Sequence, residues 1–306
     1  MRVRVGGDTV NQTAPIGLVG IGLVGTALAR SLLADGYSVL GFDIDETRAQ
    51  ALIAMGGMAA TSAVAVGRAC SSVILSLHNS DIVRDVVEGA GGLMSEGTTV
   101  TLIIDTTTGV PADTIALEQR LFDRGCAYLD ATISGSSAQI GRREGVFLVG
   151  GRPAEFARAS EILNCCATRV FHVGPPGDGA KTKLASNLIL GLNRAALAEG
   201  FVFAERLGLD LSRFAEILRH TPASSAALEN KAEKMITGNY VPQSRVAQHR
   251  KDLDIILEHG QRNGQPLPLT AIHHRLLKEA ERMGLADADT AAVIEAIRGA
   301  GKTPVE

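Results

Sequence analysis

The chain has 306 residues, 45% of them hydrophobic and 21% charged, and its formal net charge at pH 7 is −3. Because nucleic-acid binding needs a concentrated basic surface, this balance argues against a nucleic-acid partner and is typical of a soluble, cytoplasmic globular protein. The apolar run 16–23 is shorter than the roughly 20 residues of a bilayer span, and residues 1–14 hold no apolar signal core, so no membrane association is expected.

The cysteines and histidines show no metal-binding spacing. The four cysteines form no C-x-x-C pair, and the seven histidines form no H-x-x-x-H or H-E-x-x-H pattern. We expect no metal site, and we expect buried or half-buried free thiols in a reducing compartment at Cys70, Cys126, Cys165 and Cys166.

The first half of the chain, from residue 14 to about residue 174, alternates short β-rich runs with helical patterns such as 24–34 and 111–124. This alternation predicts βαβ units and a mainly parallel sheet of Rossmann type, covered on both faces, in a domain spanning 14–176. The expected strands are 16–19, 38–42, 73–77, 100–104, 127–131, 146–149 and 169–172.

The second half, 177–306, reads as an all-helical domain for substrate binding and oligomerisation. It opens with one uninterrupted helical pattern over 179–207, about 40 Å long at 1.5 Å per residue. So long a helix is expected to pack between domains, between subunits or both, which favours a homodimer or homotetramer. Further helices are expected at 211–220, 225–237, 250–263, 268–283 and 289–297.

A G-x-G-x-x-G pattern follows the first expected strand and opens a helix, which is the context that a dinucleotide-binding fingerprint requires. The first glycine permits a tight turn, the second lets the pyrophosphate approach the backbone, and the third allows close helix–strand packing. Asp43 ends the second strand, 23 positions after Gly20, where it would accept hydrogen bonds from the adenine ribose. The expected cofactor-binding residues of this loop are Gly20, Ile21, Gly22, Leu23, Val24 and Gly25.

The residues after Asp43 favour NAD over NADP. NADP sites usually place an arginine just after the second strand, whereas this chain has Ile44 followed by Asp45 and Glu46. The nearest cation, Arg48, is expected to point along the next helix.

Three further stretches carry a family resemblance: "DATISGSS" at 130–137, "GDGAKTKLASN" at 177–187 and "HRKDLDIIL" at 249–257. With the glycine loop they make the chain resemble the β-hydroxyacid dehydrogenases, which include 3-hydroxyisobutyrate dehydrogenase, tartronate semialdehyde reductase and, more remotely, 6-phosphogluconate dehydrogenase. The resemblance implies a small carboxylate substrate and NAD(P)-dependent, reversible oxidation of a β-hydroxy acid to its semialdehyde or keto acid.

The resemblance also implies roles for single residues. Ser134, Gly135 and Ser136 would bind the substrate carboxylate. Lys183 would be the general acid/base and Asn187 would orient the substrate; four residues apart, they share one helix face, whereas Lys181 should point elsewhere.

The nicotinamide end of the cofactor would be contacted by Lys251 from the helical domain and by Leu77, His78 and Thr108 from the Rossmann domain. His78 departs from the proline usual in the family. Arg142 and Arg143 are extra cations after the substrate loop, which either help to bind a more acidic substrate or belong to a solvated turn.

Two other functions fit the same scaffold. One is an imine reductase or other reductase, whose members typically carry a residue other than lysine at position 183. The other is a non-catalytic NAD-binding regulator, since fold does not imply activity. The presence of Lys183 favours the dehydrogenase over both.

Overall fold

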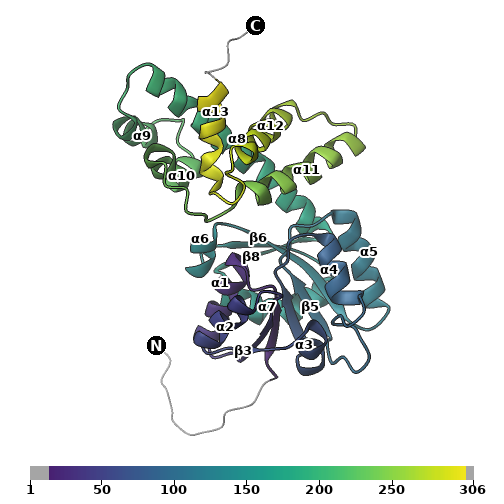
Figure 1. The fold of residues 1–306 in the computed structure, drawn as a ribbon. Coiled ribbons are helices and arrows are strands. Elements are labelled where there is room, and N and C mark those ends of the chain that lie inside the picture. Colours follow the sequence, from purple (N-terminus) through teal and green to yellow (C-terminus); the bar gives the residue numbers. More distant parts are fainter. Residues whose placement is uncertain (1–13, 301–306) are drawn as a thin grey trace.

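A computed structural model, which describes residues 14–300, shows a Rossmann-type α/β domain followed by an all-helical domain (Figure 1). The predicted fold class is confirmed. The two domains are joined by one long helix, α8, which begins beside the sheet and continues into the helical layer above it.

The α/β domain contains one eight-stranded sheet with the order β3-β2-β1-β4-β5-β6-β7-β8. All seven predicted strands are present, and the sequence patterns missed only the two-residue edge strand β3. The strands are β1 (Ile16–Val19), β2 (Val39–Phe42), β3 (Met58–Ala59), β4 (Ser72–Leu75), β5 (Leu102–Asp105), β6 (Ala127–Ser134), β7 (Val146–Gly150) and β8 (Arg169–Gly174).

Strands β1 to β6 are parallel, β7 runs antiparallel to β6, and β8 runs parallel to β7. Strand β1 lies between β2 and β4, so the order of the strands reverses at β1. In such sheets ligands bind beyond the carboxyl ends of the strands at the point of reversal. The glycine loop follows β1, and the segments with His78 and Thr108 follow β4 and β5, so all three lie at this edge.

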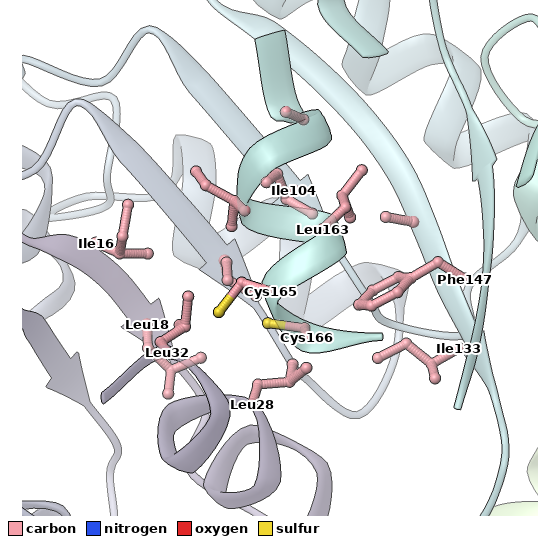
Figure 2. Close-up of a cluster of buried hydrophobic side chains, with 14 of the residues drawn as sticks. Ile16, Leu18, Leu28, Leu32, Ile104, Ile133, Phe147, Leu163, Cys165 and Cys166 are labelled. Carbon is pink, nitrogen blue, oxygen red and sulfur yellow. The ribbon is translucent and has the colours of Figure 1, made fainter. Parts of the chain in front are cut away.

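Helices cover both faces of the sheet. Helices α1, α2 and α7 contribute to one buried cluster, and α3, α4 and α5 contribute to the other. Figure 2 shows Cys165 and Cys166 of α7 in the first cluster, beside Leu28 and Leu32 of α1. The helices are α1 (Leu23–Ala34), α2 (Glu46–Ala54), α3 (Ala63–Ala69), α4 (Ser80–Glu88), α5 (Pro111–Phe122), α6 (Ser137–Gly141) and α7 (Pro153–Cys166).

The helical domain is built around α8, whose 29 residues match the predicted length. The expected packing of α8 between the two domains is confirmed, because it contacts β6, β7 and β8 as well as the later helices. The predicted final helix is divided into a 3-10 turn and α13. The elements are α8 (Asp178–Arg206), α9 (Leu211–Arg219), α10 (Ala226–Thr237), α11 (Val246–Arg262), α12 (Pro268–Arg282), the 3-10 turn η1 (Thr290–Ala292) and α13 (Val293–Ala300).

The start of α8 is docked directly onto the sheet. The N-cap residue, Gly177, has no side chain, and Asp130 of β6 replaces a cap by accepting hydrogen bonds from the backbone N–H groups of Gly177 (3.1 Å) and Ala180 (2.8 Å). A side chain at Gly179 would place its Cβ only 2.2 Å from the carbonyl oxygen of Asp130. The glycines of "GDGAKTKLASN" therefore let the helix approach the sheet closely, which fixes Lys183 one turn beyond the junction.

All four cysteines are buried and free, as expected. Within residues 14–300 no three histidine, cysteine or acidic side chains are grouped so that they could hold a metal ion. In the same part of the chain no helix is both long and apolar enough to cross a membrane.

Candidate active site

The glycine loop has the geometry of a pyrophosphate cradle. Gly20 has a φ of +91°, and a Cβ there would lie 2.2 Å from the carbonyl oxygen of Ser76; a Cβ at Gly25 would lie 2.0 Å from the carbonyl oxygen of Gly20. By contrast, nothing lies within 4 Å of a Cβ built on Gly22, so this backbone is open to a close approach. Helix α1 begins at Leu23, so Gly25 belongs to its first turn, and first-turn N–H groups suit a bound phosphate.

Asp43 is held beside this loop. Its Oδ2 accepts a hydrogen bond from the backbone N–H of Ile21 at 2.7 Å, and its Oδ1 accepts one from Asp45 at 2.9 Å. The expectation that Arg48 points along the next helix is wrong: its guanidinium lies 3.3 Å from Asp43 and 3.3 Å from Asp45. Two carboxylates attract it back toward the end of β2, so a cation does stand beside the residue expected to bind the ribose.

A cleft of about 570 Å³ opens at the glycine loop. Three arginines from different elements line it together with the loop: Arg30 of α1, Arg48 of α2 and Arg245, which precedes α11. Cations around the N-terminus of a helix suit the doubly negative pyrophosphate of a dinucleotide. The residues present therefore fit a nicotinamide dinucleotide, and Ile21, Gly22 and Leu23 of the glycine loop line this cleft.

Lys251 joins the helical domain to the expected nicotinamide end. Its ammonium donates hydrogen bonds to the carbonyl oxygens of His78 (2.9 Å) and Thr108 (2.8 Å), and it lies 3.2 Å from Asp252. Burial lowers the pKa of His78, and the charge of Lys251 lowers it further, which favours the neutral imidazole. The predicted strand over 73–77 ends at Leu75, which leaves Leu77 in the loop with His78.

Lys183 is buried, with 7% of its surface exposed. Burial lowers its pKa to about 8; Asp252 opposes this shift, while Arg194 and Lys251 add to it. Lys181 points away, as expected, and pairs with Asp178 at 2.8 Å. Lys183, and not Lys181, is therefore the lysine whose ammonium can lose its proton near neutral pH.

Asn187 lies one turn after Lys183 and donates from Nδ2 to Oδ2 of Asp252 at 2.9 Å. The sequence reasoning did not assign Asp252 a role, although it directly follows Lys251 in the quoted segment. Because Asp252 contacts Asn187 and Lys251 and acts electrostatically on Lys183, it is the common partner of the three.

The serine loop is only partly available to a ligand. Ser134 ends β6 and Gly135 is exposed, whereas Ser136 forms a capping box with Gln139 at the start of α6. Both the backbone N–H and the hydroxyl of Ser136 lie within 3.0 Å of Oε1 of Gln139. The expected donors of Ser136 are therefore already engaged, while Ser134 and Gly135 remain at the end of the strand.

Arg142 and Arg143 form ion pairs instead of facing a substrate. Arg142 pairs with Glu144 at 2.7 Å and Arg143 with Asp35 at 2.5 Å. The structure therefore supports the interpretation that Arg142 and Arg143 belong to a solvated surface turn, and not that they bind a more acidic substrate.

Comparison with known proteins agrees with this geometry. The protein-family model for the NAD-binding domain of 6-phosphogluconate dehydrogenase matches residues 15–174. The family model for NAD-binding of NADP-dependent 3-hydroxyisobutyrate dehydrogenase matches residues 177–297.

Individual relatives match along nearly the whole chain. The 2-(hydroxymethyl)glutarate dehydrogenase of Eubacterium barkeri is 32% identical over 94% of this chain and 95% of its own. The L-threonate dehydrogenase of Cupriavidus necator is 30% identical over 93% of this chain and 96% of its own. The crystal structure of 3-hydroxyisobutyrate dehydrogenase from Salmonella typhimurium superposes with a TM-score of 0.84 at 28% identity, covering 92% of this chain and 99% of the other. The chain therefore belongs to the β-hydroxyacid dehydrogenase family of NAD(P)-dependent oxidoreductases.

Proposed function

We propose that Lys183 is the general acid/base of a reversible oxidation in which a small β-hydroxy acid loses its hydroxyl proton to this residue. The nicotinamide cofactor supplies the hydride chemistry when it is bound. The observation that carries the proposal is the buried Lys183, whose pKa of about 8 is close to the pH at which the proton must move.

The direction of proton transfer follows from the charge state of Lys183. Its neutral amine accepts the proton of the substrate hydroxyl during oxidation, and its ammonium returns a proton to the carbonyl oxygen during reduction. Burial favours the neutral amine, whereas Asp252 prevents the pKa from falling further.

Substrate positioning is proposed for Asn187 and for the serine loop. With Asp252 holding one N–H of its amide, Asn187 has its carbonyl oxygen and its second N–H for the substrate. The substrate carboxylate is proposed to bind the hydroxyl of Ser134 and the backbone at Gly135. Ser136 joins them when the side chain of Gln139 moves aside.

The cofactor roles of the glycine loop, Asp43, Leu77, His78, Thr108 and Lys251 belong to the same proposal. NAD is preferred because the carboxylate of Asp43 would repel the 2′-phosphate of NADP, although the positive charge of Arg48 weakens this repulsion.

The chain is further proposed to act as two domains, 14–176 and 177–306, in a cytoplasmic homodimer or homotetramer. Ile189, Phe203 and Leu207, at 60%, 65% and 60% exposure on or just after α8, support a contact between subunits along this helix.

The three relatives named above are called after hydroxy acids, so the first substrates to test are 3-hydroxyisobutyrate, threonate and 2-(hydroxymethyl)glutarate. Formation of reduced cofactor is followed by absorbance. Lys183→Met should lose at least about 1,000-fold in kcat while still binding NAD, measured by fluorescence titration. Lys181→Met is the matched control and should keep full activity. An active Lys183→Met enzyme would refute the assignment.

A further inference from the structure

A buried cluster of basic side chains lies beyond Asn187 in the helical domain. The face of α8 that carries Lys183 and Asn187 continues through Gly191 to Arg194, since these positions fall within one stripe of a 3.6-residue helix. His249 of α11 and His273 of α12 pack against this stripe. Arg194, His249 and His273 are only 4%, 6% and 1% exposed.

The polar atoms of this cluster lack partners among the described residues. No described side chain or backbone group hydrogen-bonds to Nε or Nη1 of Arg194, to Nε2 of His249 or to either ring nitrogen of His273. Buried polar groups are normally hydrogen-bonded, and an unpaired buried cation is strongly destabilising. Five such atoms in one cluster leave hydrogen-bonding capacity for a group that is not part of this chain.

No acidic side chain in the described structure neutralises Arg194 by direct contact. The carboxylate that acts on it through space, Asp289, is paired with Lys231 at 2.7 and 2.9 Å. Asp289 also accepts hydrogen bonds from the backbone N–H groups of Gln243 and Ala291. Arg194, Lys231 and Asp289 together thus leave one positive charge uncompensated.

The two histidines are donors or acceptors in this cluster and add no charge. Burial lowers the pKa of His273 to about 3 and that of His249 well below its ordinary value, and the charge of Arg194 adds to both shifts. The cluster therefore presents one guanidinium cation with two neutral imidazoles beside it, and the guanidinium and one N–H of each imidazole can donate to a single carboxylate.

The cluster is continuous with the proposed substrate site. His249 lies one helical turn before Asp252 on α11, and Asp252 contacts Asn187. A Cβ at Gly191 would lie 2.6 Å from Nε2 of His249, so the two helices touch at this point as well. Arg194 follows Asn187 by seven residues, about 10 Å of helix, and its charge acts through space on Lys183, where it helps to lower the pKa.

We propose that Arg194, with His249 and His273, binds a second carboxylate of the substrate, so that the enzyme acts on hydroxy dicarboxylic acids. The inference rests on the proposed function, because the first carboxylate and the reacting hydroxyl are those placed at Ser134, Gly135 and Lys183.

The test uses three substrates that share the same reacting hydroxymethyl group and α-carboxylate. They differ in the substituent on the α-carbon: 3-hydroxyisobutyrate has a methyl group and 2-(hydroxymethyl)glutarate has a carboxyethyl group. The third substrate is the terminal amide of 2-(hydroxymethyl)glutarate, whose substituent has the same length but no charge. The wild-type kcat/KM for the dicarboxylate should exceed that for the amide by roughly 100-fold, mainly because the dicarboxylate has the lower KM.

Arg194→Met should remove this preference, lowering kcat/KM for the dicarboxylate by about 100-fold and changing the values for the other two substrates by less than about 3-fold. Arg194→Lys should restore part of the preference, because it keeps the charge without the planar donors. Arg206→Met, at an exposed position on the same helix, is the matched control and should behave as wild type. If Arg194→Met does not fold, Arg194→Lys and Arg194→Gln give the same comparison.

Three outcomes would overturn the inference. The first is equal wild-type activity on the dicarboxylate and the amide, and the second is an equal loss on all three substrates in Arg194→Met. The third is activation of the 3-hydroxyisobutyrate reaction by added acetate in wild type but not in Arg194→Met, without a preference for the dicarboxylate, which would assign the cluster to a free anion. A wild type that does not oxidise the dicarboxylate counts with the first of these outcomes, whereas an active Lys183→Met enzyme would instead refute the proposed function itself.

Discussion

Asn187 of the long helix α8 donates a hydrogen bond to Asp252 of α11 at 2.9 Å, and both side chains are buried. Lys251, which precedes Asp252 in the sequence, donates hydrogen bonds to the carbonyl oxygens of His78 and Thr108. A chain of polar contacts therefore runs from the face of α8 to the two loops of the Rossmann domain where the nicotinamide is expected. This connection couples the helix that carries Lys183 to the domain that carries the cofactor.

Asp252→Asn tests that coupling. The substitution keeps a neutral acceptor for Asn187 but removes the charge that raises the pKa of Lys183, so the kinetic pKa of oxidation should fall below that of wild type. kcat/KM should drop by about 10- to 100-fold because Asn187 and Lys251 lose a charged partner. Asp254→Asn is the control on the same helix, since Asp254 pairs with Arg250 and His274 away from the site. An unchanged pH profile in Asp252→Asn would contradict the coupling.

The two serines of the substrate loop should respond differently to replacement by alanine. Ser134→Ala should raise KM by about 10-fold or more with little loss of stability, because its hydroxyl is proposed to bind the carboxylate. Ser136→Ala removes the N-cap of α6 and should lower the free energy of unfolding by about 1 kcal/mol with a smaller change in KM. Steady-state kinetics and denaturant titration measure the two effects. A larger KM change in Ser136→Ala than in Ser134→Ala would show that the assignment is reversed.

Cofactor preference should depend on the pair formed by Asp43 and Arg48. Wild type should bind NAD more tightly than NADP, measured as two dissociation constants by fluorescence titration. Asp43→Ser removes the carboxylate and leaves Arg48 paired with Asp45 alone, so affinity for NADP relative to NAD should rise by about 10- to 100-fold. In the double variant with Arg48→Ala most of this gain should disappear. An equal NADP affinity in the single and double variants would show that Arg48 does not contact the 2′-phosphate.

The sequence patterns located the sheet and the long helix because those elements bury continuous apolar runs or contain strong helix formers. They missed β3 because two exposed residues, Met58 and Ala59, carry no periodic signal. They placed the start of α11 four residues late, at residue 250. The first N–H groups of this helix bond to the carbonyl oxygens of Ala288 and Ala286, and a partner so distant in sequence cannot be foreseen from local composition.

In the candidate site, too, local sequence patterns differ from contacts between residues that are distant in sequence. Lys183 and Asn187 could be predicted because "GDGAKTKLASN" resembles the family motif, and their four-residue spacing then placed both on one face of a helix. The positions of Arg48, Asp252 and Arg194 depend on which charges the fold brings beside them. Asp252 contacts a residue 65 positions away, and no motif records that distance.

The pH dependence of oxidation tests the central role of Lys183 most directly. With NAD saturating and substrate limiting, kcat/KM for oxidation should rise from about pH 6 and level off above an apparent pKa of about 8, because the neutral amine is the base. The reduction measured in the same buffers should show the mirror image, falling above the same pKa as the ammonium loses its proton. A profile that is flat in both directions between about pH 6 and about pH 10 would contradict proton transfer by Lys183.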